Sequence, residues 1–215
     1  MNHRQEKSKL IPLFPTPATV TNIGRSFTKP ELRFIADLPM RTPGDIRGRK
    51  KSVNHRSKDY YLFDNFVEVL KDIKTFCEHH LKLYLEEIEG ADTNLAGIRI
   101  TESWLNKTKP QEYHHLHHHT NSYLSGVFYI KCLPKDGIIF TNRMDGSFNN
   151  IKFPIKKNTF WSSGDAFVDV VEGDLIIFPS WVPHQVDVNK TIDKERISDD
   201  PRFPFGMPKQ STQML

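Results

Sequence analysis

The chain has 215 residues, of which 37% are hydrophobic and 26% charged, a composition typical of a soluble globular protein with a hydrophobic core. This composition excludes a mainly disordered chain. No apolar run approaches the roughly 20 residues that span a membrane. The first ten residues are polar and basic, unlike a secretory signal, and two cysteines do not suggest a disulfide framework. We therefore expect a cytoplasmic protein with no membrane partner.

A basic segment supplies much of the formal net charge of +4. Residues 41–58 contain seven lysine or arginine side chains and a single acid, Asp45. Such a segment can bind phosphate or nucleic acid, but more often it is a solvated loop. No recognised aromatic-basic module accompanies it, so we do not expect nucleic acid to be the main partner.

The N-terminal part of the chain favours extended structure over helix. Three prolines within residues 10–17 exclude a helix there. Residues 19–34 are predicted to form a strand and then a turn around Thr28–Pro30, and residues 40–59 form the basic loop.

A long helix is predicted over residues 63–90. Asn65 and Glu68 have the spacing of a capping box, and Gly90 is placed to end the helix. Apolar residues recur with the i, i+3, i+4, i+7 spacing of one buried helix face. They are Phe66, Val69, Leu70, Ile73, Phe76, Cys77, Leu81, Tyr84, Leu85 and Ile88.

After Gly90 the pattern changes to about eight short strands at roughly ten-residue spacing, which is typical of an antiparallel barrel or sandwich. We predict one domain over 1–215 that is mainly β with N-terminal α: a double-stranded β-helix (jelly roll) barrel flanked by a long helix. N-terminal strands and the basic loop fill 1–62, the jelly-roll core 95–200 and an irregular tail 201–215. The strands are expected at 95–105, 122–133, 137–140, 160–171 (in two pieces), 173–179, 184–188 and 195–198, with a turn at 143–146.

Five of the ten histidines lie within positions 114 to 119. Alternate side chains of a strand share a face, so His115, His117 and His119 should point one way, and His114 and His118 the other. Imidazole is the commonest metal ligand in proteins, and two imidazoles at i and i+2 can hold one ion. A solvated histidine-rich loop is the alternative.

A distal histidine and an arginine give this cluster a more specific meaning. His184 follows a buried strand and a proline-rich corner, and Arg196 lies in the middle of a predicted strand. An arginine inside a barrel is costly unless it meets an anion, and its planar fork suits a carboxylate. A surface salt bridge to a neighbouring acid is the alternative reading of Arg196.

The chain resembles the 2-oxoglutarate- and Fe(II)-dependent oxygenases, most closely the 2OG-Fe(II) oxygenases of bacteria and marine phages. The segments that carry the resemblance are Ser103–Asn106, His117–Tyr129, Gly173–Val186 and Glu195–Ser198, with weaker similarity in Leu13–Pro17 and Ser57–Leu62. The two longest segments are specific, whereas the others mean little alone. If the gene is phage-encoded, the compartment implied is the host cytoplasm.

The resemblance implies a site and two cofactors. Fe(II) would be held by His117, His119 and His184. His115 is the reserve ligand if the register differs by one pair, and His114 and His118 are expected to point outward. Arg196 would bind the distal carboxylate of 2-oxoglutarate. Further cosubstrate contacts would come from Ser198 and Tyr129, with Asn106 and Ser125 as weaker candidates.

Two positions depart from the family pattern. His119 stands where a carboxylate is usual, so the site uses either three histidines or an acid from elsewhere. Asp145, Asp165, Asp169 and Asp187 are present but lack the expected spacing. A three-histidine site also makes Zn(II) a more credible occupant. After Ser198, an acidic run replaces an apolar continuation, which predicts a short final strand.

The activity implied is a dioxygenase that uses O2 and hydroxylates an unknown substrate, with decarboxylation of 2-oxoglutarate to succinate. Two alternatives remain: a cupin-like metal-binding jelly-roll module without oxygenase activity, and a structural or nucleic-acid-associated protein with incidental histidines. Many such barrels pair through the helix side, so a homodimer is among the expectations.

Overall fold

The fold is described from a computed structural model, in which residues 11–41, 54–95, 97–142, 154, 156–157, 159, 163–199 and 201–203 are described. Most of the predicted basic loop, the turn expected at 143–146 and most of the tail lie outside these residues. The helices of the described part are α1 (Lys29–Asp37), α2 (Leu62–Asn65), α3 (Val67–Leu83) and the π-helical turn η1 (Tyr84–Ile88). None of them is long and apolar enough to span a membrane.

The protein is mainly β, with antiparallel strands in two sheets, as predicted. The large sheet has the order β1-β9-β6-β11-β4-β3-β2, with β12 also pairing with β6, and the small sheet has the order β5-β10-β7-β8. The strands are β1 (Thr19–Asn22), β2 (Met40–Arg41), β3 (His55–Ser57), β4 (Leu105–Thr108), β5 (His114–His117), β6 (Leu124–Lys131), β7 (Gly137–Thr141), β8 (Asp165–Asp169), β9 (Asp174–Pro179), β10 (His184–Val186), β11 (Arg196–Asp199) and β12 (Arg202–Phe203).

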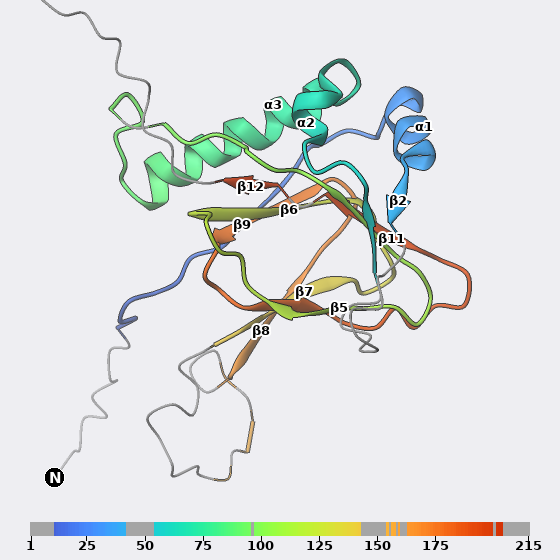
Figure 1. Ribbon diagram of the computed structural model, residues 1–215. Helices are drawn as coiled ribbons and strands as arrows, with labels where there is room; N and C mark the ends of the chain where they lie inside the picture. The colour runs from blue at the N-terminus through green and yellow to red at the C-terminus, as the bar shows by residue number, and fades with distance from the viewer. Residues whose placement is uncertain are drawn as a thin grey trace, which may run out of the picture.

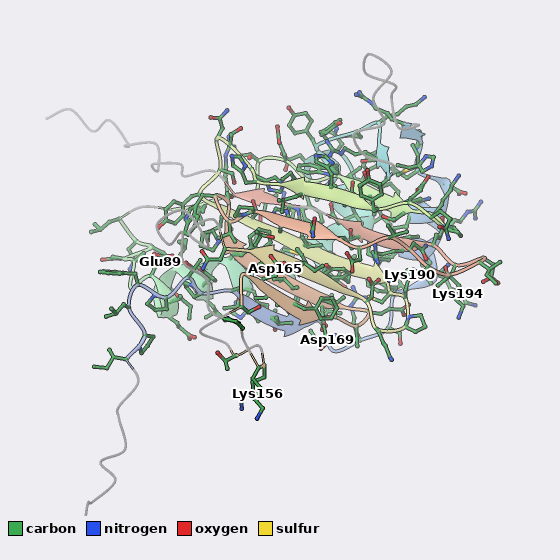
Figure 2. All side chains as sticks on the ribbon, turned by 90° about the horizontal axis from the view of Figure 1, so that it is seen from below. Glu89, Lys156, Asp165, Asp169, Lys190 and Lys194 are labelled. Carbon is green, nitrogen blue, oxygen red and sulfur yellow. The ribbon has the colours of Figure 1, made fainter. Side chains whose placement is uncertain are left out.

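Three layers result from this arrangement (Figure 1): the helices cover one face of the large sheet, and the small sheet faces its other side. Figure 2 views the molecule from the side of the small sheet, with Asp165 and Asp169 at the two ends of β8. From β4 to β11 the chain passes repeatedly between the two sheets, so strands distant in sequence become neighbours.

Strand β6 separates two hydrophobic cores, because it is buried on both faces. Phe128 and Ile130 face the helices and pack with Leu81 and other residues of α3. Val127 and Tyr129 point to the opposite side and pack with residues of β7 and β9 between the two sheets. Alternation along one strand thus supplies both the helix-facing core and the inner core on which the candidate site rests.

The long helix differs from the prediction at its start. It is broken into α2 and α3, and the N-cap of α3 is Phe66, which makes no side-chain cap. The capping box predicted at Asn65 is wrong, because the Asn65 side chain instead donates to Asp59 Oδ2 at 2.8 Å. The end is as predicted: η1 stops at Ile88, and Gly90 adopts the left-handed φ of +67° that favours glycine.

The true capping box lies in the segment predicted as a turn. Thr28 caps α1: its Oγ1 accepts from the Glu31 backbone N–H at 3.3 Å, and its own N–H donates to Glu31 Oε2 at 2.6 Å. The prediction of a turn at Thr28–Pro30 is therefore wrong, although β1 confirms the strand before it. The strand expected over 95–105 is also wrong for most of its length, since β4 begins at Leu105.

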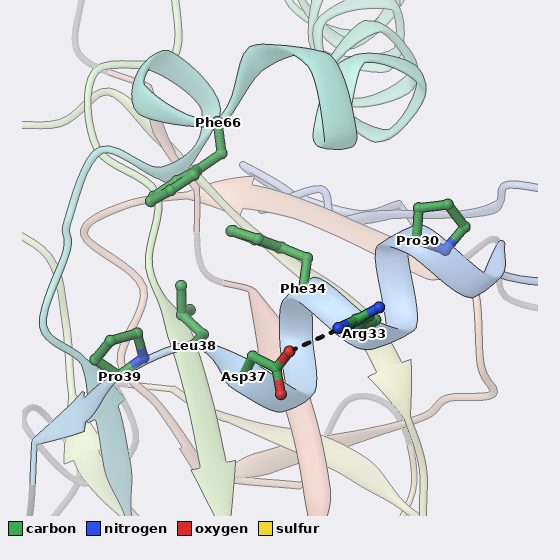
Figure 3. Close-up of a pocket in the computed structure, with 7 residues that line it drawn as sticks. All are labelled: Pro30, Arg33, Phe34, Asp37, Leu38, Pro39 and Phe66. Atoms are coloured by element: carbon green, nitrogen blue, oxygen red, sulfur yellow. Dashed lines mark ion pairs between the residues drawn. The ribbon is translucent and has the colours of Figure 1, made fainter.

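A shallow apolar groove of about 460 Å³ lies against α1 and is bordered by Phe34, Leu38 and Phe66 (Figure 3). Arg33 and Asp37 form an ion pair of 3.7 Å at its edge. None of the predicted site residues lines this groove.

Candidate metal centre

Three histidines from two segments meet at one end of the space between the sheets. His117 ends β5, His119 follows it by two residues, and His184 begins β10, where it pairs in register with His117. One ligand atom from each lies within 4.8 Å of the others, so the three can surround a single ion. Within the described part of the chain, no other group of histidine, cysteine or acidic residues has this geometry.

Each of the three imidazoles is held through its Nδ1 atom. Nδ1 of His117 lies 2.7 Å from the His115 carbonyl oxygen, and Nδ1 of His184 lies 3.0 Å from that of Val182. A carbonyl can only accept, so in the neutral ring Nδ1 carries the hydrogen and Nε2 presents its lone pair. Hydrogen bonds of this kind fix the tautomer and the orientation of metal-binding histidines.

His119 is held by hydroxyl groups rather than by a carbonyl. Its Nδ1 lies 2.7 Å from Ser125 Oγ, which lies 2.7 Å from Ser180 Oγ. All three side chains are buried. If Ser125 passes its hydrogen to Ser180, it accepts from His119, and Nε2 of His119 is then the metal-binding atom, as in the other two rings.

Burial favours the neutral form of His117 and of the neighbouring His114. Desolvation, followed by the proximity of His184, lowers the pKa of His117 to about 3. Desolvation is also the main cause that lowers the pKa of the buried His114. A divalent cation requires deprotonated ligands, so these rings are in the form that a metal needs at neutral pH.

The prediction that His114 points outward is wrong, and a β-bulge explains why. His114 pairs with Val186 and His117 with His184, so three steps along β5 face two steps along β10. The extra residue shifts the alternation of side chains, as bulges do. His114 is therefore buried and stacks on His117, with ring centroids 4.3 Å apart. His118 is exposed, as predicted.

No carboxylate joins the three histidines among the described residues. Asp165 and Asp169 lie on β8, which is separated from β5 by β7 and β10, and Asp145 lies outside the described residues. His115, the reserve ligand in the sequence argument, is not part of the three-histidine group. The donor set is therefore three neutral imidazoles. Such a set fits Zn(II), and it fits Fe(II) with one anionic ligand fewer than the usual two-histidine, one-carboxylate site.

The predicted cosubstrate residues form one row across the large sheet. Register pairs Asn106 with Ser198 and Ser198 with Tyr129, on the neighbouring strands β4, β11 and β6. Paired residues share a face, and Tyr129 belongs to the core between the sheets. The row thus faces the small sheet, which carries the histidines. All three side chains are buried.

Arg196 already has a carboxylate partner, but the ion pair is buried and not the surface salt bridge that was the alternative reading of the sequence. Its Nε lies 2.7 Å from both carboxylate oxygens of Asp136, and its Nη2 lies 2.5 Å from Oδ1. Asp136 also accepts from the backbone N–H groups of Leu133 and Gly137. Buried Nη1 of Arg196 has no hydrogen-bond partner among the described residues, so one side of the fork remains to bind another acceptor.

The sequence argument missed two residues of this region. Asp136 lies in the turn before β7, where an Asp-Gly pair is an ordinary turn signal. Arg56 was counted only as part of the basic loop, but it lies on β3 and pairs in register with Asn106. Its guanidinium carbon is 5.1 Å from the ring centroid of Trp104, which in turn lies 6.1 Å from that of His119.

The comparisons with known proteins point to one family. Residues 102–199, a little under half of the chain, match the family model described as "Putative 2OG-Fe(II) oxygenase". The matched segment begins at Glu102 and ends at Asp199. It contains every predicted metal and cosubstrate residue. The resemblance noted in the sequence is therefore confirmed. A search of curated protein sequences gives no match.

Solved structures agree in fold. A Pseudomonas putida prolyl-4-hydroxylase has a TM-score of 0.52 at 18% identity, with 88% of this chain and 93% of that chain covered. The carbocyclase SnoK of nogalamycin biosynthesis, described as non-heme and alpha ketoglutarate dependent, has a TM-score of 0.57 at 12% identity, with coverages of 87% and 79%. The epimerase SnoN, solved with Fe3+, alpha ketoglutarate and nogalamycin RO, has a TM-score of 0.53 at 13% identity, with coverages of 81% and 71%.

Proposed function

We propose that this chain is a 2-oxoglutarate- and Fe(II)-dependent oxygenase, with the metal on His117, His119 and His184. The observation that carries the proposal is the convergence of three neutral imidazoles whose Nδ1 atoms are already engaged. The metal and cosubstrate, when bound, supply oxidation by O2 coupled to conversion of 2-oxoglutarate to succinate and CO2. The family match over 102–199 supports this assignment.

The chain's own part in this reaction is to bind, orient and exclude water. The three Nε2 atoms would hold the metal, and the Nδ1 partners would keep each ring in its orientation. Nη1 of Arg196 would bind the distal carboxylate of 2-oxoglutarate, with Ser198, Tyr129 and Asn106 lining the path between this anchor and the metal. Asp136 would fix the guanidinium so that Nη1 is presented to the cosubstrate.

The apolar core between the sheets supports the same proposal. Phe178 packs against His184 with ring centroids 4.8 Å apart, and Phe140 packs against Phe178 at 4.9 Å. Such an apolar floor keeps water from the reacting atoms and strengthens electrostatic contacts within the site. We infer that the two sheets form the double-stranded β-helix of this family, with the histidines at its open end.

We further propose that the primary reaction is hydroxylation of a C–H bond. The similar solved structures are described as a prolyl-4-hydroxylase, a carbocyclase and an epimerase, so the fold is compatible with several outcomes. Hydroxylation requires no group on the protein beyond the metal centre, the cosubstrate and a positioned substrate. Hydroxylation is therefore the reaction that requires the fewest catalytic groups among the described residues.

A metal-binding jelly roll without oxidation chemistry is the second candidate. The observation that favours it is the all-histidine ligand set, since three histidines and a water are a known zinc arrangement. This candidate predicts a zinc-loaded protein that does not consume 2-oxoglutarate. The metal content after anaerobic, iron-replete purification separates the two.

The direct test is the formation of succinate from 2-oxoglutarate by the iron-loaded protein without added substrate. We expect slow succinate formation in the wild type and at least a ~100-fold loss in His184→Ala, which removes one of three ligands. Arg33→Gln is the control, because this side chain is 86% exposed on α1 and should leave the rate unchanged. Undiminished succinate formation in His184→Ala would remove His184 from the ligand set.

A further inference from the structure

Among the arginines whose side chains are described, Arg56 is the half-buried one without an acidic partner; Arg41 and Arg99 also lack one, but both are exposed. Arg25 contacts Glu31, Arg33 contacts Asp37 and Arg196 contacts Asp136. Within the described part of the chain, no carboxylate lies within ion-pair distance of Arg56. Its guanidinium instead rests on aromatic rings, 5.1 Å from the centroid of Trp104 and 5.8 Å from that of Tyr60.

The half-buried Arg56 lies next to the metal centre rather than on an outer face. It extends the row of predicted cosubstrate residues by one strand, because it pairs with Asn106 across β3 and β4. Trp104, beneath the guanidinium, is buried and contacts His119. A cation in this position adds to the charge of any metal bound there.

A partly desolvated guanidinium without an acid is costly unless a ligand supplies the anion. Cation–π contact with Trp104 and Tyr60 offsets part of that cost but uses only the faces of the group. The N–H donors at the edge of the fork are left for a planar or tetrahedral oxyanion, which they can bind in a bidentate manner.

The oxyanion that Arg56 suits is not the distal carboxylate of 2-oxoglutarate. That carboxylate has its own anchor in Arg196 on β11, and β4 lies between β11 and β3 in the sheet. With neighbouring strands about 4.8 Å apart, the two backbones are about 10 Å from each other. Two arginines at this separation are placed to hold two different anions, with Arg56 at one end of the row and Arg196 two residues from Ser198 on β11.

We propose that Arg56 binds an oxyanion group, a carboxylate or a phosphate, of the primary substrate, and thereby places the substrate beside His119. This inference rests on the proposed oxygenase function, because it assigns the substrate class of that same site. It restricts the substrate to acids and phosphate esters, and it gives β3, outside the family match, a role in substrate selection.

The experiment is a titration of the metal-loaded protein, saturated with 2-oxoglutarate under anaerobic conditions, with acetate or inorganic phosphate. Ionic strength is held constant with chloride, and the emission of Trp104 is followed because this ring lies under the guanidinium. We expect a saturable change in the wild type and at least a ~10-fold weaker response in Arg56→Gln, because a charge-assisted hydrogen-bond pair is lost. Which anion binds more tightly separates a carboxylate substrate from a phosphate ester.

Three variants make the titration specific. Arg56→Lys should retain a weaker response, Arg33→Gln should match the wild type, and Trp104→Phe should lose the signal. The affinity for 2-oxoglutarate, measured by calorimetry, should be unchanged in Arg56→Gln. The proposal is overturned if the wild type shows no saturable change, if Arg56→Gln titrates as the wild type, or if it loses 2-oxoglutarate affinity to the same extent. Anion binding needs no turnover, so an inactive protein that binds anions through Arg56 would contradict only the oxygenase assignment.

Discussion

At the residue scale, the metal centre depends on the hydrogen-bond partners of the histidine Nδ1 atoms, which orient the three rings. Carbonyl oxygens of His115 and Val182 and the hydroxyl of Ser125 each engage one Nδ1. His119 is the unusual member, because a carboxylate at this position would bring a negative charge to the metal. Three neutral ligands leave the full charge of a divalent ion uncompensated, which makes an anionic cosubstrate a natural partner for the site.

Variants of Arg196 and Asp136 can distinguish the contribution of this ion pair to stability from the contribution of Arg196 to 2-oxoglutarate binding. Asp136→Ala leaves a buried guanidinium without its partner, and we expect a loss of about 3–5 kcal/mol in the free energy of unfolding. The double variant Asp136→Asn/Arg196→Met removes both charges and keeps an acceptor for the backbone N–H groups of Leu133 and Gly137. Denaturant unfolding should show that it regains most of this stability.

Binding of 2-oxoglutarate should not recover in the double variant. We expect its affinity for 2-oxoglutarate, measured by calorimetry, to fall at least ~10-fold, because the charge-assisted hydrogen bond from Nη1 is lost. Arg196→Met alone is the matched comparison and should show the same loss. Recovery of both stability and 2-oxoglutarate affinity in the double variant would limit Arg196 to a structural role.

At the scale of elements, short local motifs determine where a helix begins and which way strand side chains point. The bulge in β5 brings His114 to the face of His117, and the capping box of Thr28 and Glu31 fixes the start of α1. Neither follows from the spacing of apolar residues. Continuous runs of strand-forming and apolar residues predict β6 and β9 well, but such runs cannot show where a strand inserts one extra residue against its partner.

The capping box makes the stability of α1 depend on pH. Burial would raise the pKa of Glu31, but hydrogen bonds from Arg25 and Thr28 outweigh it and hold this pKa below its ordinary value of 4.5. A carboxyl whose pKa is depressed by folding stabilises the protein above its unfolded pKa, and this contribution is lost as pH falls through the folded value. Glu31→Gln should therefore cost about 1 kcal/mol at pH 7.

The difference between the wild type and Glu31→Gln in denaturant unfolding should shrink progressively as pH falls below 4.5. Glu78→Gln, an exposed position on α3, is the control and should change stability little at any pH. A constant difference between pH 7 and pH 3 would contradict the role given to the Glu31 carboxylate.

At the scale of the whole molecule, the sequence was sufficient for the class of fold and for the three histidines that meet. Strand spacing predicted the antiparallel β architecture, and the resemblance to the 2OG-Fe(II) oxygenases placed His184 with His117 and His119. The sequence could not show that Asp136 meets Arg196 across 60 positions, since nothing local marks a long-range ion pair. The sequence also did not indicate that Arg56 lies near the site. A basic residue in a charged loop is expected to be solvated, and only the register of β3 shows that Arg56 pairs with Asn106.

The most direct measurement of the central claim is the absorbance of the protein on anaerobic addition of Fe(II) and then 2-oxoglutarate. We predict a band near ~500 nm that needs both additions, since it arises when 2-oxoglutarate chelates Fe(II). The band should be absent from His184→Ala and unchanged in Arg33→Gln. Stoichiometric Fe(II) binding without this band, or a band that persists in His184→Ala, would contradict the assignment of His117, His119 and His184 as the iron site of an oxygenase.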